Sequence, residues 1–312
     1  MQIDMKRFIT SLFVALAITG CKKAETVVEN NILPMPRCIS LESEKFTFSQ
    51  GTAITVDAPE ADKQILEKLI TESLPKNNGN SKSSITLQVV DNVEGVTSPE
   101  GYSIAIDKNN ITVNATSAAG LFYGVQTIIQ LADDNGGIPT GTINDEPQFA
   151  YRGLMLDVSR HFFGKEFVKK QLDAMAHFKM NRLHLHLTDA AGWRIEIKKY
   201  PRLTNFAAWR SPAIWKDWWF GDRKYVEEGS EGAYGGYFTQ DDIRELVQYA
   251  AERYITIIPE IEMPAHSEEV LTAYPELSCT HEPYKQADFC IGNERTYEFL
   301  ENVLTEVMEL FP

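Results

Sequence analysis

Apolar and polar positions alternate along the second half of the chain in blocks that predict strands and helices. Apolar strand-like runs and amphipathic segments follow one another at residues 153–159, 165–178, 181–187, 240–253, 255–261 and 297–310. Alternation of this kind is typical of parallel strands joined by right-handed helical crossovers. Each strand-like run also leads into charged or hydroxyl side chains, as the strands that form the active face of a (β/α) barrel do.

The first half of the chain predicts a smaller α/β domain. Period-two alternation indicates strands at residues 84–90, 102–106 and 111–115, and Asp107–Asn110 has the composition of a hairpin turn. Helices are expected at about 61–74 and after Ser117, which suits an N-cap. Nothing in this part of the chain suggests chemistry, so we expect an accessory module.

The predicted fold class is therefore α/β, with two parts. A small α/β accessory domain at residues 32–148 precedes the first part, about three β/α units, of a (β/α)8 TIM barrel at 149–312. The glycine- and proline-containing stretches at 136–141 and 145–147 are expected to mark the boundary.

The N-terminus predicts export. Lys6 and Arg7 precede an apolar run that is too short for a stable membrane-spanning helix. The run ends in Ile18-Thr19-Gly20-Cys21, which resembles the lipobox of bacterial lipoproteins. We expect residues 1–20 to be a signal peptide, Cys21 to carry lipid, and 21–31 to be a tether. The alternative is a plain signal peptide. The expected location is the periplasm or outer membrane of a Gram-negative-type bacterium.

Composition narrows the classes of partner. The formal net charge of −14 and pI near 5.0 argue against binding to nucleic acid, which needs clustered Lys and Arg. Export favours disulfides, and Cys279 and Cys290, which bracket a polar loop, are the natural pair. Cys38 is then expected to be a buried free thiol.

Three ordered motifs identify a family. They are Asp157-Val158-Ser159-Arg160-His161-Phe162, His184-Leu185-His186-Leu187-Thr188-Asp189 with Gly192-Trp193-Arg194, and Pro259-Glu260-Ile261-Glu262-Met263-Pro264 with His266. Together they resemble the family 20 glycoside hydrolases, the β-N-acetylhexosaminidases, over almost the whole mature chain.

The resemblance implies roles for three residues and needs no cofactor or metal. Arg160 would bind hydroxyls of the non-reducing sugar, and a guanidinium fork suits paired hydroxyls. Asp189 and His266 would support the site around the catalytic acid. The structural alternative for Arg160 is an ion pair with Asp157 or another barrel acid. Ala190-Ala191 and Glu262 with Ala265 depart from the pattern that many members show, which leaves the substrate range open.

The implied reaction is the substrate-assisted, retaining hydrolysis of terminal β-linked N-acetylglucosamine or N-acetylgalactosamine from glycans. The family's adjacent Asp-Glu pair follows strand four, and strand four is expected just beyond Pro312. The chain's own pair, Asp145-Glu146, precedes strand one. We therefore expect no catalytic residue within these 312 residues, and an inactive fragment.

Two other functions stay open. Residues 205–237 are rich in aromatic side chains, which pack well on sugar rings, so the first alternative is a non-catalytic glycan-binding lipoprotein. At least half of these side chains are expected simply to pack against the barrel. A metal-dependent hydrolase is less favoured, although an imidazole and carboxylate set could form a site: His184, His186, Glu260, Glu262 and His266.

Overall fold

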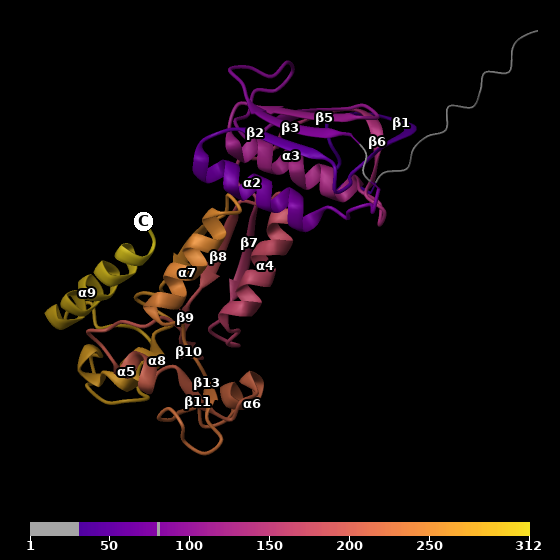
Figure 1. The fold of residues 1–312 in the computed structure, drawn as a ribbon. Helices are drawn as coiled ribbons and strands as arrows, with labels where there is room; N and C mark the ends of the chain where they lie inside the picture. Colours follow the sequence, from indigo (N-terminus) through magenta and orange to yellow (C-terminus); the bar gives the residue numbers. More distant parts are fainter. Residues whose placement is uncertain (1–30, 80–81) are drawn as a thin grey trace, which may run out of the picture.

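The computed structural model describes residues 31–79 and 82–312, which form two packed parts (Figure 1). Figure 1 shows an N-terminal sheet backed by helices α2 and α3, which face the ends of α4 and α7 of the second part. The predicted signal peptide, Cys21 and nearly all of the tether lie outside the described residues. Within the described ranges, no helix has the length and apolarity needed to cross a bilayer.

The N-terminal part is a six-stranded mixed sheet with two helices on one face. Its strand order is β1-β6-β4-β5-β3-β2, with only the β5-β3 and β3-β2 pairs parallel. The elements are β1 Cys38–Thr47, β2 Ala53–Asp57, α2 Glu60–Ser73, β3 Ser84–Val89, β4 Tyr102–Ile106, β5 Asn110–Ala115, α3 Ala118–Leu131 and β6 Gly137–Asp145. As expected, β4 and β5 form a hairpin, and the Ser117 side chain caps α3 by accepting from the Gly120 N–H.

Two predictions for this domain were wrong. Residues 136–141 are not a boundary loop, because β6 begins at Gly137 and pairs with both β1 and β4. Gly141 lies at φ +141°, where a Cβ would stand 2.0 Å from the Ser40 carbonyl oxygen, so the glycine serves a close approach of strands rather than a turn. Cys38 is exposed rather than buried, because it opens β1, an edge strand with mostly exposed side chains.

The second part is a three-stranded parallel sheet with strand order β14-β8-β7. It confirms the partial TIM-barrel fold. Its main elements are β7 Gly153–Asp157, α4 Lys165–His177, β8 Arg182–His186, α7 Gln240–Ala251, β14 Thr256–Glu260 and α9 Glu294–Leu310. Leu183 and Leu185 are buried, whereas His184 and His186 alternate with them on the other face of β8. A capping box between Thr239 and Asp242 fixes the start of α7.

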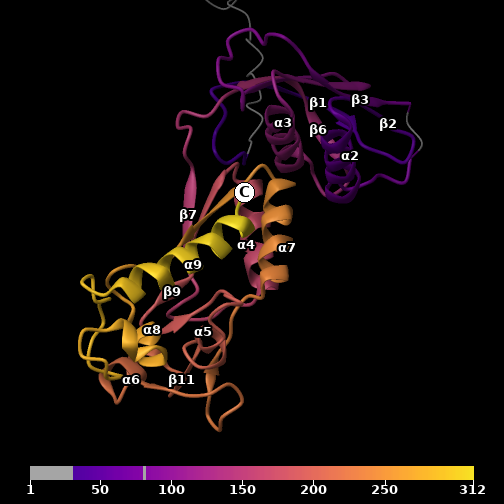
Figure 2. The same cartoon turned by 90° about the vertical axis from the view of Figure 1, so that its left-hand side faces the viewer.

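Short elements gather at the carboxyl ends of these strands, far from the N-terminal domain (Figure 2). They are β9 Thr188–Asp189, β10 Gly192–Trp193, α5 Arg202–Asn205, β11 Trp209–Ser211, α6 Trp215–Phe220, β12 Lys224–Tyr225, β13 Tyr234–Gly235, α8 Glu268–Ala273 and the 3-10 turn Pro275–Leu277. The aromatic segment folds into a small β12-β11-β13 sheet, in which Trp218 and Tyr225 are buried and Trp215 and Phe220 are exposed.

The structure joins Cys279 to Cys290 in a disulfide, with their Cα atoms 5.0 Å apart. The bridge closes a loop that leads from α8 and the 3-10 turn to α9. The Cys290 N–H also donates to the Leu277 carbonyl, so the loop is tied back to the 3-10 turn at this point.

Candidate active site

Three titratable side chains form a row across the strand ends. Parallel pairing places Asp157 of β7 beside His186 of β8, and His186 beside Glu260 of β14. Because residues in register on neighbouring strands share a face of the sheet, all three side chains lie on the face of β8 opposite Leu183 and Leu185. The row stands at the carboxyl ends of the strands, where barrel enzymes place their chemistry.

Arg160 lies over one end of this row. Its Nη1 is 2.8 Å from Asp157 Oδ2 and 2.8 Å from His186 Nε2, and its Nη2 is 2.5 Å from Asp189 Oδ2. The side chain keeps 34% of its surface exposed, and its Nε donates to no described residue. The ion pairs expected as the structural alternative are therefore present, because Arg160 pairs with two barrel acids, Asp157 and Asp189. These contacts also fix the guanidinium, while its Nε–H and one edge remain available to a ligand.

Asp189 is the point where the predicted site residues meet. The side chain is buried, and its Oδ2 lies 2.8 Å from His266 Nδ1 and 2.5 Å from Arg160. Its Oδ1 accepts from the Ala190 N–H. Burial acts to raise the pKa of Asp189, but hydrogen bonds from His186 and His266 and the charge of Arg160 outweigh it and leave the pKa below 3.8. Asp189 is therefore a carboxylate at neutral pH.

His266 is positioned by an unusual backbone conformation. It adopts φ +57°, in the left-handed region that non-glycine residues enter at a cost of about 1–3 kcal/mol. This conformation accompanies the Nδ1 contact with Asp189, while over half of the side chain remains exposed. The hydrogen bond to Asp189 and the charge of that carboxylate raise the pKa of His266 above 6.5. Nε2 forms no hydrogen bond or ion pair with a described residue, so it is available to a ligand.

Glu260 binds both histidines of β8. Its Oε2 is 2.6 Å from His186 Nδ1 and 2.7 Å from His184 Nε2. Since a guanidinium only donates, neutral His186 accepts from Arg160 at Nε2 and donates from Nδ1 to Glu260. Burial lowers the pKa of His186, but hydrogen bonds to Asp189 and Glu260 outweigh it and raise the pKa. When His186 is protonated, its Nε2–H donates to Asp189, and the positive charge of the ring repels the Arg160 guanidinium.

The proposed metal-ligand set does not assemble as a cation site in this geometry. The ligand atoms of His186, Asp189 and Glu262 lie within 4.8 Å of one another. However, His186 Nε2 and Asp189 Oδ2 are already in contact with the Arg160 guanidinium. A metal ion would have to displace a positive charge that these two groups hold, so the arrangement favours Arg160 over a metal.

Comparisons with known proteins cover both parts of the chain. The family model described as "Glycosyl hydrolase family 20, catalytic domain" matches residues 149–312, and "Glycosyl hydrolase family 20, domain 2" matches residues 29–146. The chain belongs to glycosyl hydrolase family 20. These ranges lie close to the predicted accessory and barrel domains.

Individual relatives agree with the family. A β-hexosaminidase of Porphyromonas gingivalis is 38% identical over 90% of this chain and 37% of its own length. The solved β-N-acetylhexosaminidase of Streptomyces coelicolor matches with a TM-score of 0.73 and 31% identity, over 90% of this chain and 57% of that chain. A mutant Streptomyces plicatus β-hexosaminidase in complex with its product GlcNAc matches with a TM-score of 0.73 and 32% identity, over the same shares. The family 20 chain thus spans well under two thirds of these relatives.

Two buried arginines of this family 20 chain went unassigned at the sequence level. Arg194 and Arg210 have no exposed surface, and both guanidiniums donate only to main-chain carbonyls. Arg194 reaches the carbonyls of Ser159, Ala191, Ala208 and Gly236. Arg210 reaches those of Arg160, Ala191 and Ala213. The pair therefore joins the loops that carry Arg160 and Asp189 to the aromatic segment.

The sequence near these arginines gives little indication that they are buried. Arg194 lies between the apolar residues Trp193 and Ile195, but the sequence alone does not show that all three side chains are buried. Gly192 leaves the space that the Arg194 guanidinium fills, since a Cβ there would stand 2.3 Å from Nη2. Burial lowers the pKa of Arg194 to about 9, so the side chain remains charged at neutral pH.

The Asp145-Glu146 pair lies away from this site. Asp145 accepts from Tyr102 Oη at 2.8 Å and pairs with Lys179 at 3.1 Å. Glu146 accepts from the Thr97 N–H and forms an ion pair with Arg37. Both carboxylates thus belong to the base of the barrel strands, where the linker leaves β6.

Proposed function

We propose that this chain supplies the sugar-binding wall of a β-N-acetylhexosaminidase that releases terminal β-linked N-acetylglucosamine or N-acetylgalactosamine from glycans. The observation that carries the proposal is the placement of Arg160 at the strand ends, fixed by Asp157, His186 and Asp189 in a chain of family 20. The names of the relatives supply the reaction class.

In this proposal, Arg160 binds hydroxyls at the non-reducing end of the sugar. A guanidinium whose Nη atoms are already held by carboxylates loses little rotamer freedom on binding, so its remaining N–H can be used at low entropic cost. The ionised Asp189 keeps Arg160 charged and in place.

Asp189 and His266 are proposed to support the catalytic acid. The acid itself belongs to an Asp-Glu pair: its Asp orients the substrate acetamido group, and its Glu protonates the leaving oxygen and later activates water. The substrate carbonyl attacks the anomeric carbon. Among the described residues, the adjacent pair Asp145-Glu146 is engaged at the other end of the strands. We therefore propose that the 312 residues alone bind sugar without hydrolysing it.

Titration of the chain with N-acetylglucosamine, followed by calorimetry or ligand-detected NMR, tests the binding role. Arg160→Ala is expected to weaken binding by about tenfold or more, because it removes a charged hydrogen-bond donor. Arg244→Ala is the matched control, since Arg244 is exposed on α7 and pairs only with neighbours on that helix. Equal binding by the Arg160 and Arg244 variants would contradict the role of Arg160.

We also propose that the protein is an exported lipoprotein anchored through Cys21. The support is the charged start, the short apolar run and the lipobox-like Ile18-Thr19-Gly20-Cys21. Because one acyl chain anchors weakly, durable attachment needs more than one. Cys21→Ala should shift the protein from the membrane fraction to the soluble fraction, whereas unchanged membrane retention would refute the anchor.

A further inference from the structure

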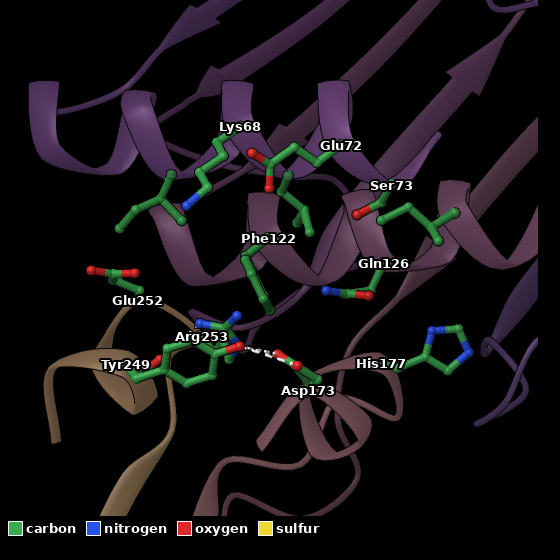
Figure 3. A pocket seen from close by; sticks show the side chains of 14 residues that line it. Lys68, Glu72, Ser73, Phe122, Gln126, Asp173, His177, Tyr249, Glu252 and Arg253 are labelled. Carbon is green, nitrogen blue, oxygen red and sulfur yellow. Dashed lines mark hydrogen bonds and ion pairs between the residues drawn. The ribbon is translucent and has the colours of Figure 1, made fainter. Parts of the chain in front are cut away.

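A pocket of about 300 Å³ lies between the two parts of the molecule (Figure 3). Helices α2 and α3 of the N-terminal domain form one wall, and α4 and α7 of the barrel form the other. Its volume is at the lower end of the range for small-molecule sites, which suits a single compact ligand. None of the residues that line it belongs to the Arg160 and Asp189 cluster.

Gln126 supplies an unsatisfied polar group in this pocket. The residue is only 5% exposed and stands on a helix whose other buried positions are mostly apolar. Its amide makes no hydrogen bond to any described residue, whereas the amide of Gln130, one turn later, donates to the carbonyls of Leu33 and His177. Figure 3 shows the Gln126 amide extending from α3 into the gap towards α4 and α7. Because the amide lines the pocket without a described partner, both its donor and its acceptor are available to a ligand with hydroxyls.

A fixed ion pair forms part of the opposite wall. Asp173 accepts from Tyr249 Oη at 2.9 Å and from Arg253 Nε at 2.7 Å. The Arg253 guanidinium also lies 3.4 Å from the centre of the Tyr249 ring. The charges of Asp173 and Arg253 offset each other and are fixed by these contacts, so the pair offers oriented hydrogen-bonding groups. Glu252 adds a further carboxylate beside the pair.

The remaining lining favours a ligand with one apolar face. Phe122, Ile65 and Leu69 contribute apolar surface, and Ser73 adds a hydroxyl at the end of α2. A ligand that pairs with the Gln126 amide needs both donors and acceptors, as hydroxyl groups have. Sugar rings combine hydroxyls with a C–H face that packs against aromatic and aliphatic side chains.

We propose that this interdomain pocket is a second carbohydrate-binding site, separate from the Arg160 site, that takes one uncharged sugar ring of monosaccharide size. The proposal stands on the pocket, on the unpartnered Gln126 amide and on the fixed Asp173–Arg253 pair, and does not depend on the proposed hydrolase function. Occupation would bridge α3 to α4 and α7, so binding of the sugar would tie the accessory domain to the barrel.

The test uses the full chain with Arg160→Ala, which weakens the proposed first site. N-acetylglucosamine, galactose and glucose are titrated separately by calorimetry and ligand-detected NMR, with zwitterionic serine as a non-sugar probe. Saturable binding of at least one sugar is expected. Adding Gln126→Leu should weaken that binding by about tenfold, since it removes the amide but leaves a similar volume. Folding should survive, because the amide satisfies no described partner.

Ser73→Trp provides a second variant, because it places a bulky ring at the exposed end of α2 where the pocket opens. It should abolish binding, while Thr71→Trp, exposed on the same helix and outside the pocket lining, should not. The proposal is overturned if no sugar binds the Arg160→Ala chain, if both pocket variants bind as well as their parent, or if serine binds and no sugar does. The effect of Arg160→Ala on the parent chain tests the first site only, whereas the pocket variants test the second site. A negative result at one site therefore leaves the proposal for the other site unaffected.

Discussion

The N-terminal domain and the barrel part differ in where they bury charge. Among the described residues, the charged side chains buried below the surface are Lys179, Asp189, Arg194, Arg210 and Glu269, and all follow residue 150. The N-terminal domain buries apolar side chains and a few neutral polar ones instead. Burying an ionised group is costly unless it is hydrogen bonded. The difference shows that the buried ionisable groups belong to the barrel part, where Asp189 fixes Arg160 and Arg194 joins the surrounding loops.

Glu269 is the clearest example of a buried ionisable group in the barrel part. Its side chain is fully buried, and no described group reaches either carboxylate oxygen in full hydrogen-bond geometry, although the backbone N–H groups of Glu269 and Val270 lie near it. Burial raises the pKa of Glu269 well above its ordinary value, and the charge of Asp189 raises it further. The described residues of the N-terminal domain include no comparably buried carboxyl group.

The largest expected effect comes from Arg194→Met. The change removes donors to carbonyls in three loops and leaves those carbonyls buried, so the free energy of unfolding should fall by about 3–5 kcal/mol. Chemical denaturation measures the loss. Arg244→Met, at an exposed position with an i,i+3 partner, should cost about 0.5 kcal/mol or less. Similar losses for both variants would show that the buried arginine does not hold the loops.

A core change in the N-terminal domain should be nearly as large but insensitive to pH. Leu87 is fully buried in β3, so Leu87→Ala should cost about 2–5 kcal/mol through lost burial and a residual cavity. The same loss is expected at acidic and mildly alkaline pH, because no buried charge of this domain titrates with it. Denaturation curves at two pH values check this, and a strongly pH-dependent loss would break the comparison.

Replacing Cys279 and Cys290 together by Ser should cost about 2–3 kcal/mol, because the bridge closes a short loop next to α9. Thermal unfolding with and without the double change measures this effect. The exposed Cys38→Ser is the control and should leave stability unaltered. A stability equal to that of the parent would mean that the disulfide contributes nothing in solution.

The smallest expected effect is electrostatic and lies in the site. The raised pKa of His266 means that its pairing with Asp189 is fully stabilising below 6.5 and is lost as pH rises through the raised value. The lowered pKa of Asp189 means that its contribution is present above 3.8 and is lost as pH falls below that value. Asp189→Asn should therefore move the NMR-monitored pKa of His266 down towards its ordinary value. An unmoved His266 pKa would contradict the pairing.

Local sequence patterns predicted most of the elements but not their neighbours. The helices α2, α3, α4 and α7 and the strands of the barrel part begin and end within a few residues of the predicted positions, because each has its own periodicity. Side-chain caps also mark the starts of α3 and α7. The glycine-containing strand β6 was misread, because its identity depends on pairing with β1 and β4. Exposure of Cys38 likewise depends on its place at the sheet edge.

The site was predictable only in part for the same reason. Motif resemblance pointed to Arg160, Asp189 and His266, and the structure brings their side chains into one cluster. The row through Asp157, His186 and Glu260 depends on the register of three strands, which no single strand encodes. Arg194 and Arg210 act on carbonyls of distant loops, so only the folded chain reveals their partners.

The central claim is that these residues bind a terminal sugar but hold no acid placed to protonate its leaving oxygen. Assay of the pure 312-residue chain on a chromogenic N-acetylglucosaminide, with N-acetylglucosamine binding measured on the same sample, tests it most directly. The account predicts N-acetylglucosamine binding that Arg160→Ala weakens, without turnover. Turnover near that of a complete hexosaminidase, abolished by Asp189→Ala or Glu262→Ala, would show that catalysis lies within these residues and would contradict the claim.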